Sequence, residues 1–183
     1  MQKINYFELL EEISVLSTRA VFLSAENTRS ALQKSISECQ KLQEESLEKI
    51  CAVENFLFTD FLPPLERRSI AEAAHGMGKI IECSYQIIYQ KLQRSGYDKR
   101  IKEQEVCLAL AQIIEESVGL LKKIKKPNQM PKNKEFRQLL LSSQKTTKST
   151  QKRQSSSALC INELRRELSD CFDKIIEIML CNI

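Results

Sequence analysis

The amino-acid sequence predicts an all-α protein: an antiparallel helical bundle of about six helices that forms a single domain over residues 1–183. The chain has only four Gly and four Pro, and its apolar residues recur at steps of three and four. A β-rich fold needs a turn about every 8–12 residues and would use more turn formers. A chain of 183 residues is also long enough to bury a real core in one domain.

The first third of the chain predicts two long helices. No Gly or Pro occurs between Asn5 and Phe61, and one helix over that stretch would be about 85 Å long at ~1.5 Å per residue. We therefore expect a break in the polar stretch 26–30. The first helix can begin with a capping box formed by Asn5 and Glu8. The expected inward residues are Leu9, Ile13, Leu16, Ala20 and Leu23 in the first helix, and Leu32, Ile36, Cys39, Leu42, Leu47, Ile50, Leu57 and Phe58 in the second.

A proline pair, Pro63-Pro64, ends the second helix and starts a third that runs to about Arg94, because the fixed φ of proline suits a first helical turn. Gly76 and Gly78 lie inside this third helix at a cost of about 1 kcal/mol each against Ala, so they indicate either a close helix contact or a bend. Its expected inward residues are Ile70, Ala73, Met77, Ile80, Ile81, Ile87 and Ile88.

The second half predicts two further clear helices. Gly96 stops the third helix, Asp98 can cap the fourth, and the fourth ends in the lysines of 122–126. A short helix over 133–141 is also consistent with the pattern, and Ser156 or Ser157 can cap the last helix. The expected inward residues are Val106, Leu110, Ile113, Ser117, Leu120 and Ile124 in the fourth helix, and Ile161, Leu164, Leu168, Cys171, Ile175 and Ile178 in the last.

The charge is distributed unevenly. The stretch from Lys122 to Arg153 holds eleven Lys or Arg and one acid, Glu135, which makes +10; the whole chain carries +4, so the remainder carries −6. We expect residues 127–157 to form a basic, weakly structured connection within the domain. Segment 122–153 would be attracted to an anionic membrane surface, although a solvated linker is an equally good interpretation. Nucleic acid is a disfavoured partner, because Phe136 is the only aromatic residue there.

The seven cysteines are scattered, with no CxxC, so they predict neither a disulfide framework nor a zinc module. We expect reduced thiols that act as small core residues in the cytoplasm. The N-terminus has acids where a secretion signal would be apolar, and no apolar run reaches 18 residues, so we expect neither a signal peptide nor a spanning helix.

One segment is more specific than the rest. Residues 57–82 read LFTDFLPPLERRSIAEAAHGMGKIIE: a helix ending in a phenylalanine, a proline pair, an acid, an arginine and a helix with an Ala-His step. This segment resembles the PhoU-like family of phosphate-transport regulators. The stretch 7–12 resembles the family's start, and 163–180, with Asp170 and Asp173 at carboxylate positions, resembles its closing helix. The motif positions are occupied by Phe61, Pro64, Glu66, Arg67 and His75.

The resemblance implies two three-helix pseudo-repeats packed as one bundle. It also implies metal clusters held by carboxylates four residues apart on one helix face, but this chain departs from that pattern. The corresponding positions hold Gln43 with Leu47, Gly78 with Glu82, and Arg166 with Asp170, and no carboxylate follows Phe136 in its segment. We therefore expect a degenerate member with no family-type metal cluster and no cofactor. Glu82 and Asp170 are the weak metal candidates that survive.

The other candidate residues point away from catalysis. His75 is the only histidine, and no P-loop, G-x-S-x-G or H-E-x-x-H accompanies it, so we interpret it as a surface or packing residue. Arg67-Arg68, at a helix start, can bind an anion or simply pair with nearby glutamates. We therefore predict that the protein is not an enzyme.

Three hypotheses of function follow. The favoured one is a non-enzymatic regulator of inorganic phosphate transport that contacts a membrane phosphate permease, in the cytoplasm or peripherally at the inner face of the membrane. The second is a helical adaptor or chaperone-like module unrelated to phosphate. The third and least favoured is an enzyme with a carboxylate-bound metal. A homodimer is left open.

Overall fold

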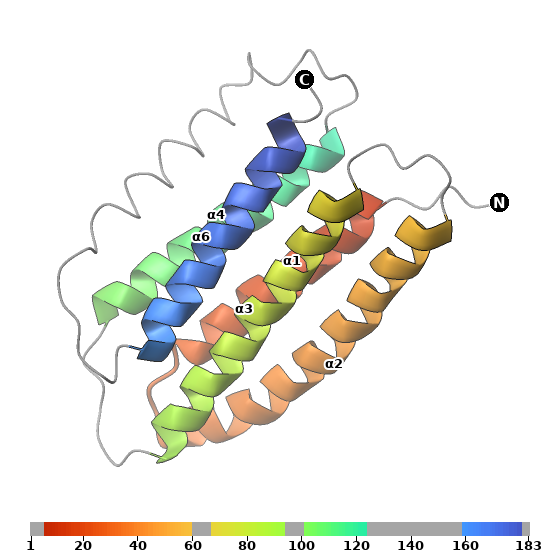
Figure 1. Ribbon diagram of the computed structural model, residues 1–183. Helices are drawn as coiled ribbons and strands as arrows, with labels where there is room; N and C mark the ends of the chain where they lie inside the picture. Colours follow the sequence, from red (N-terminus) through yellow and green to blue (C-terminus); the bar gives the residue numbers. More distant parts are fainter. Residues whose placement is uncertain (1–5, 60–66, 94–100, 124–158, 181–183) are drawn as a thin grey trace.

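The chain folds into a bundle of long helices (Figure 1). The computed structural model describes residues 6–59, 67–93, 101–123 and 159–180. These residues form α1 (Tyr6–Ser24), α2 (Arg29–Thr59), α3 (Arg67–Gln93), α4 (Ile101–Lys123) and α6 (Leu159–Leu180), with no strand among them. The all-α prediction is confirmed. No helix in the described ranges is both long and apolar enough to cross a membrane.

The predicted break between the first two helices is confirmed at residues 25–28. The Ala25 amide still donates to the carbonyl of Val21 at 3.2 Å, whereas the Ala31 amide donates to the side chain of Thr28 at 3.4 Å. Thr28 therefore caps α2. The other expected boundary residues, namely Asn5, Pro63-Pro64, Gly96, Asp98 and Ser156-Ser157, lie outside the described residues, as does the short helix expected over 133–141.

The helices are arranged as a trio and a pair. α1, α2 and α3 all contact one another, while α4 packs against α1, α6 packs against α3, and α4 and α6 contact each other. Figure 1 shows α1 and α3 running in one direction and α2, α4 and α6 in the other. The two contacts that join the trio to the pair, α1 with α4 and α3 with α6, are therefore antiparallel.

Most predicted core positions are confirmed. The expected stripes of α3 and α6 are buried throughout, and the main core joins α1, α3, α4, α6 and the C-terminal half of α2. Leu9, Leu23, Ile36 and Val106 are only half-buried. A smaller cluster between α1, α2 and α3 contains Leu16, Ala20, Leu32, Cys39, Leu42, Ile81 and Ile88.

Two predicted core residues of α2 are wrong: Leu47 is 61% exposed and Phe58 is 91% exposed. The inward positions beside them belong to Ser46 and Leu57, which are buried. A serine can face inward in a helix because its hydroxyl donates to a carbonyl of the preceding turn, as Ser46 does to Gln43 at 2.9 Å. Ser14, Ser17 and Ser24 do the same in α1, with distances of 2.7–2.8 Å.

Two glycines bring α3 close to its neighbours. A Cβ on Gly76 would lie 3.3 Å from the Cβ and Sγ of Cys171 in α6. A Cβ on Gly78 would lie 2.8 Å from the Cδ1 of Ile50 in α2. Of the two interpretations offered by the sequence, close helix contact is the one that the structure supports.

The expectation for the cysteines holds only in part. Cys39, Cys107 and Cys171 are buried free thiols, and burial raises the pKa of each to about 12. Cys83 and Cys160 are half-buried, and Cys51 is exposed on α2. Cys51 is therefore not a core residue, since it lies on the side of α2 that faces away from α1 and α3.

Candidate functional site: a charged groove between α3 and α6

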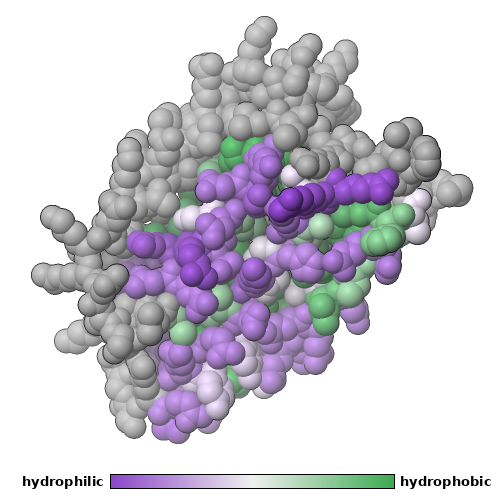
Figure 2. Space-filling model, in the orientation of Figure 1, coloured by the Kyte–Doolittle hydropathy of each residue, from purple (hydrophilic) through white to green (hydrophobic). Residues whose placement is uncertain are grey.

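A hollow on the described surface follows the line where α3 and α6 meet. It consists of two adjoining pockets of about 510 and 480 Å³. The first has Glu82, Cys83, Cys160 and Glu163 on its walls, the second has Glu72, His75, Asp170 and Lys174, and both share Lys79, Arg166 and Glu167. We call the two pockets together the α3–α6 groove. In the orientation of Figure 1, hydrophilic side chains spread over this face, with scattered apolar patches between them (Figure 2).

The groove follows from the local sequence of the two helices. On α3, positions 72, 75, 79, 82 and 86 recur at steps of three and four, so they share the polar face of one helix. The floor holds small residues, including Gly76 and Cys171, which come into near contact there. Small side chains below and long charged side chains at the rims leave an open channel between the helices.

An ion-pair network ties α3 to α6 at one end of the groove. Glu72 of α3 accepts from Arg68 at 2.6 Å and from the Lys174 ammonium of α6 at 2.8 Å. Lys174 also contacts Glu177 at 3.0 Å. The hydrogen bonds from Lys174 and Arg68 lower the pKa of Glu72 to about 2, and the bond to Glu72 raises the pKa of Lys174.

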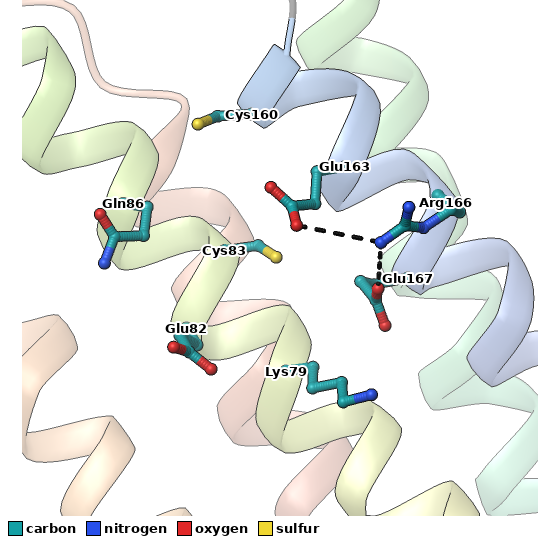
Figure 3. Close-up of a pocket in the computed structure, with 8 residues that line it drawn as sticks. All are labelled: Lys79, Glu82, Cys83, Gln86, Cys160, Glu163, Arg166 and Glu167. Carbon is teal, nitrogen blue, oxygen red and sulfur yellow. Dashed lines mark hydrogen bonds and ion pairs between the residues drawn. The ribbon is translucent and has the colours of Figure 1, made fainter.

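The middle of the groove alternates positive and negative groups. The Arg166 guanidinium lies 2.9 Å from a carboxylate oxygen of Glu167 and 3.9 Å from one of Glu163, and the bond to Glu167 raises the pKa of Arg166 (Figure 3). In this view the Glu167 carboxylate lies between the guanidinium of Arg166 and the ammonium of Lys79. Among the described residues, Lys79 makes no ion pair.

Two thiols lie near the other end of the groove. Burial, followed by the charges of Glu163 and Glu167, raises the pKa of Cys83 to about 12, so this thiol stays protonated at neutral pH. Gln90 donates to the Cys160 sulfur at 2.9 Å. A protonated thiol is a poor nucleophile, so Cys83 is suited to wall the groove rather than to attack a substrate.

The residues proposed from sequence fall into two groups, the metal candidates and the motif residues. Glu82 and Asp170 are both exposed and belong to different pockets, so the structure does not bring them together. Within the described ranges, no three His, Cys, Asp or Glu side chains are placed to hold a metal ion. The absence of a metal cluster stays a prediction.

The motif residues are only partly described. His75 is exposed and contacts Glu54 of α2 at 2.8 Å, so it is a surface residue, and it also lines the groove. Arg67 opens α3 and is exposed. Phe61, Pro64 and Glu66 lie outside the described residues.

Sequence reasoning missed Lys79, Glu163, Glu167 and Lys174 as groove residues. Their only signal is the recurrence of charge at steps of three and four, which every solvated helix face shares. What distinguishes these faces is that α3 and α6 lie side by side, and that fact comes only from the fold.

The groove and the bundle around it define the class as an all-helical protein with an open, mixed-charge surface channel. Comparison with known proteins adds no family: no family model matches the chain, and no curated protein matches it.

Proposed function

We propose that the protein is a non-enzymatic regulator of inorganic phosphate transport that acts by contact with a membrane phosphate transporter. The observation that carries the proposal is segment 57–82 with its PhoU-like motif, because residues 67–82 of that segment belong to α3, the helix that forms one wall of the groove. The trio of α1, α2 and α3 joined to α4 and α6 by two antiparallel contacts supports the six-helix arrangement of two pseudo-repeats.

The α3–α6 groove is the contact surface in this proposal. Lys79, Glu82 and Asp170 line it and form no ion pair with any described residue, so their charges are available to a partner. The network around Glu72 and Lys174 fixes one end of the groove before the partner arrives. A pre-ordered charged surface favours specificity and the rate of association more than raw affinity.

The basic segment 122–153 supplies the second contact. With a net charge of +10 it gains about 1 kcal/mol per Lys or Arg near an anionic membrane surface. The proposal therefore places the protein in the cytoplasm, peripherally at the inner face of the membrane, beside the transporter.

The test joins co-purification with phosphate uptake. We expect the tagged protein to capture an inorganic-phosphate permease, and a Lys79→Glu/Arg166→Glu variant to lose that capture. Glu105→Lys/Glu116→Lys is the matched control, because both glutamates are exposed on α4 away from the groove. Phosphate uptake that is unchanged when the protein is deleted would count against the proposal.

A helical adaptor unrelated to phosphate is the second candidate. It is favoured by the carboxylates of Glu82, Glu163 and Glu167 in the groove, which would repel a phosphate ion but would suit a polypeptide with basic side chains. Capture of a single client with no permease, dependent on the same groove residues, would support the adaptor.

A further inference from the structure

The outer face of α2 is a second surface that the groove does not explain. Among the described helices, α2 packs mainly against α1 and α3, and Figure 1 shows it at the edge of the bundle. Its exposed positions recur at helical steps and include Lys34, Lys41, Glu44, Glu48, Cys51 and Phe58. This exposed stripe runs along the helix for 31 residues, or about 46 Å at 1.5 Å per residue.

The charges on this face are separated along the helix. Arg29, Lys34 and Lys41 lie in the N-terminal half, and Glu44 and Glu48 begin the C-terminal half, where all five are exposed. None of the five makes an ion pair within the part of the chain that the structure describes. A face whose N-terminal half is positive and whose acids begin at its midpoint can set a lysine against a glutamate of a second copy that is turned end for end.

We propose that a second copy of this chain docks on the outer face of α2, with the two α2 helices antiparallel about a two-fold axis near Glu44. A two-fold contact uses the same patch on both copies, so residue i meets residue j and j meets i. α2 runs from 29 to 59, so residue 44 is its midpoint and the whole helix takes part.

The register places opposite charges together. Lys41 of each copy faces Glu48 of the other. A parallel arrangement would set Lys against Lys and Glu against Glu, so the charge pattern selects the antiparallel one.

The apolar residues of α2 fit the same register. Phe58, which is 91% exposed, faces Arg29 of the other copy, whose guanidinium can lie on its ring. Leu47, which is 61% exposed, faces the methylene stem of Lys41. Glu44 and Glu45 of the two copies meet at the axis, with Lys41 one turn away on either side. The contact is therefore mainly electrostatic, and raising the salt concentration should weaken it.

The first test is sedimentation equilibrium of the full chain in low and high salt. We expect a dimer in low salt that dissociates as salt rises. Lys34→Glu/Lys41→Glu and Glu44→Lys/Glu48→Lys should each weaken self-association at least tenfold, whereas an equal mixture of the two variants should form a heterodimer. Glu105→Lys/Glu116→Lys on α4 is the control and should dimerise like the wild type.

Each outcome of this test is decisive. A wild type that stays monomeric at high protein concentration in low salt overturns the proposal and leaves the face to another occupant. Reversed variants that dimerise as tightly as the wild type, or a mixture that gives no heterodimer, overturn it as well. Recovery in the mixture also shows that both variants are folded.

Disulfide trapping tests the register. In a chain with Cys51 and Cys181 changed to Ser, Glu44→Cys places two thiols beside the axis, so oxidation with diamide should yield a covalent dimer. Arg29→Cys in the same chain places them about 45 Å apart, at 1.5 Å per residue, and should yield none. The reverse result would overturn the antiparallel register.

Discussion

α3 and α2 are both long helices of the same trio, yet they occupy very different places in the molecule. α3 contacts α1, α2 and α6, and ten of its residues are buried. α2 is four residues longer, contacts α1 and α3, and has eight buried residues, while Leu47 and Phe58 face outward. The difference shows that neighbours on both sides, more than the apolar content of a helix, decide how much of it is buried.

Truncating one apolar side chain in each helix is the strongest test of this comparison. Ile80 of α3 is fully buried in the main core, and Ile80→Ala should lower the free energy of unfolding by about 2–5 kcal/mol. Leu47→Ala on α2 should change it by less than about 0.5 kcal/mol, because the side chain is already mostly solvated. Urea unfolding at low protein concentration measures both. Equal losses would show that the outer face of α2 is covered in solution.

In the last turn of α3, Lys91 contacts the C-terminal end of α1 and the residues that follow it. The Lys91 ammonium donates to the Ser24 carbonyl at 2.7 Å, to the Glu26 carbonyl at 2.9 Å and to the Asn27 side chain at 3.2 Å. A cation at the carbonyl end of a helix is favourable. We expect Lys91→Met to destabilise the fold by about 1–2 kcal/mol. Lys79→Met is the control, because it removes an exposed lysine that makes no ion pair with the described residues, and its free energy of unfolding should stay within about 0.5 kcal/mol of the wild type. A similar loss of stability in both variants would refute a capping role for Lys91.

The same difference between α2 and α3 explains how much of the fold the sequence could predict. Every residue that periodicity placed inward in α3 and α6 is buried, because isoleucines and leucines dominate those stripes, although it did not predict the buried Phe172 and Met179 of α6. It placed Leu47 and Phe58 inside because a pattern of apolar residues cannot reveal that Ser35 and Ser46 take inward positions of α2. Serines that satisfy their own hydroxyl within the helix carry no hydrophobic signal.

The site was harder to predict than the fold. His75, Glu82 and Asp170 were found through a resemblance and do line the groove, His75 and Asp170 in one pocket and Glu82 in the other. Lys174 was not found, since its role depends on Glu72, which is about a hundred positions earlier in the chain. Contacts of that kind depend on which helices are neighbours, and periodicity does not carry that information.

Alanine substitutions at two helical glycines compare a tightly packed position, Gly76 of α3, with an open one, Gly119 of α4. A Cβ on Gly119 of α4 would have no atom within 4 Å, so Gly119→Ala should stabilise the protein by up to about 1 kcal/mol through helix propensity. At Gly76 the same gain is opposed by contact with the Cβ of Cys171, which cannot rotate away. We expect Gly76→Ala to be less stable than Gly119→Ala by at least about 1 kcal/mol in thermal or urea unfolding. Equal stabilisation at both sites would show that α3 and α6 can separate at little cost.

The smallest expected effect concerns the ion pair that joins α3 to its third neighbour, α6. The pKa of Glu72 is about 2 in the folded protein against an ordinary value of 4.5, because Lys174 and Arg68 bond to its carboxylate. A carboxylate whose folded pKa is lowered stabilises the fold above its unfolded pKa, and this contribution is lost as the pH falls through the folded value.

We therefore expect Glu72→Gln to be slightly less stable than the wild type at pH 6, with the difference shrinking between about pH 4.5 and pH 2. Lys174→Met should remove most of this pH dependence, because it removes the partner that contributes most to the shift. Denaturant unfolding across this pH range measures the stability of both variants. If the difference in stability between Glu72→Gln and the wild type stays constant down to about pH 2, the contact between α3 and α6 does not depend on this charge.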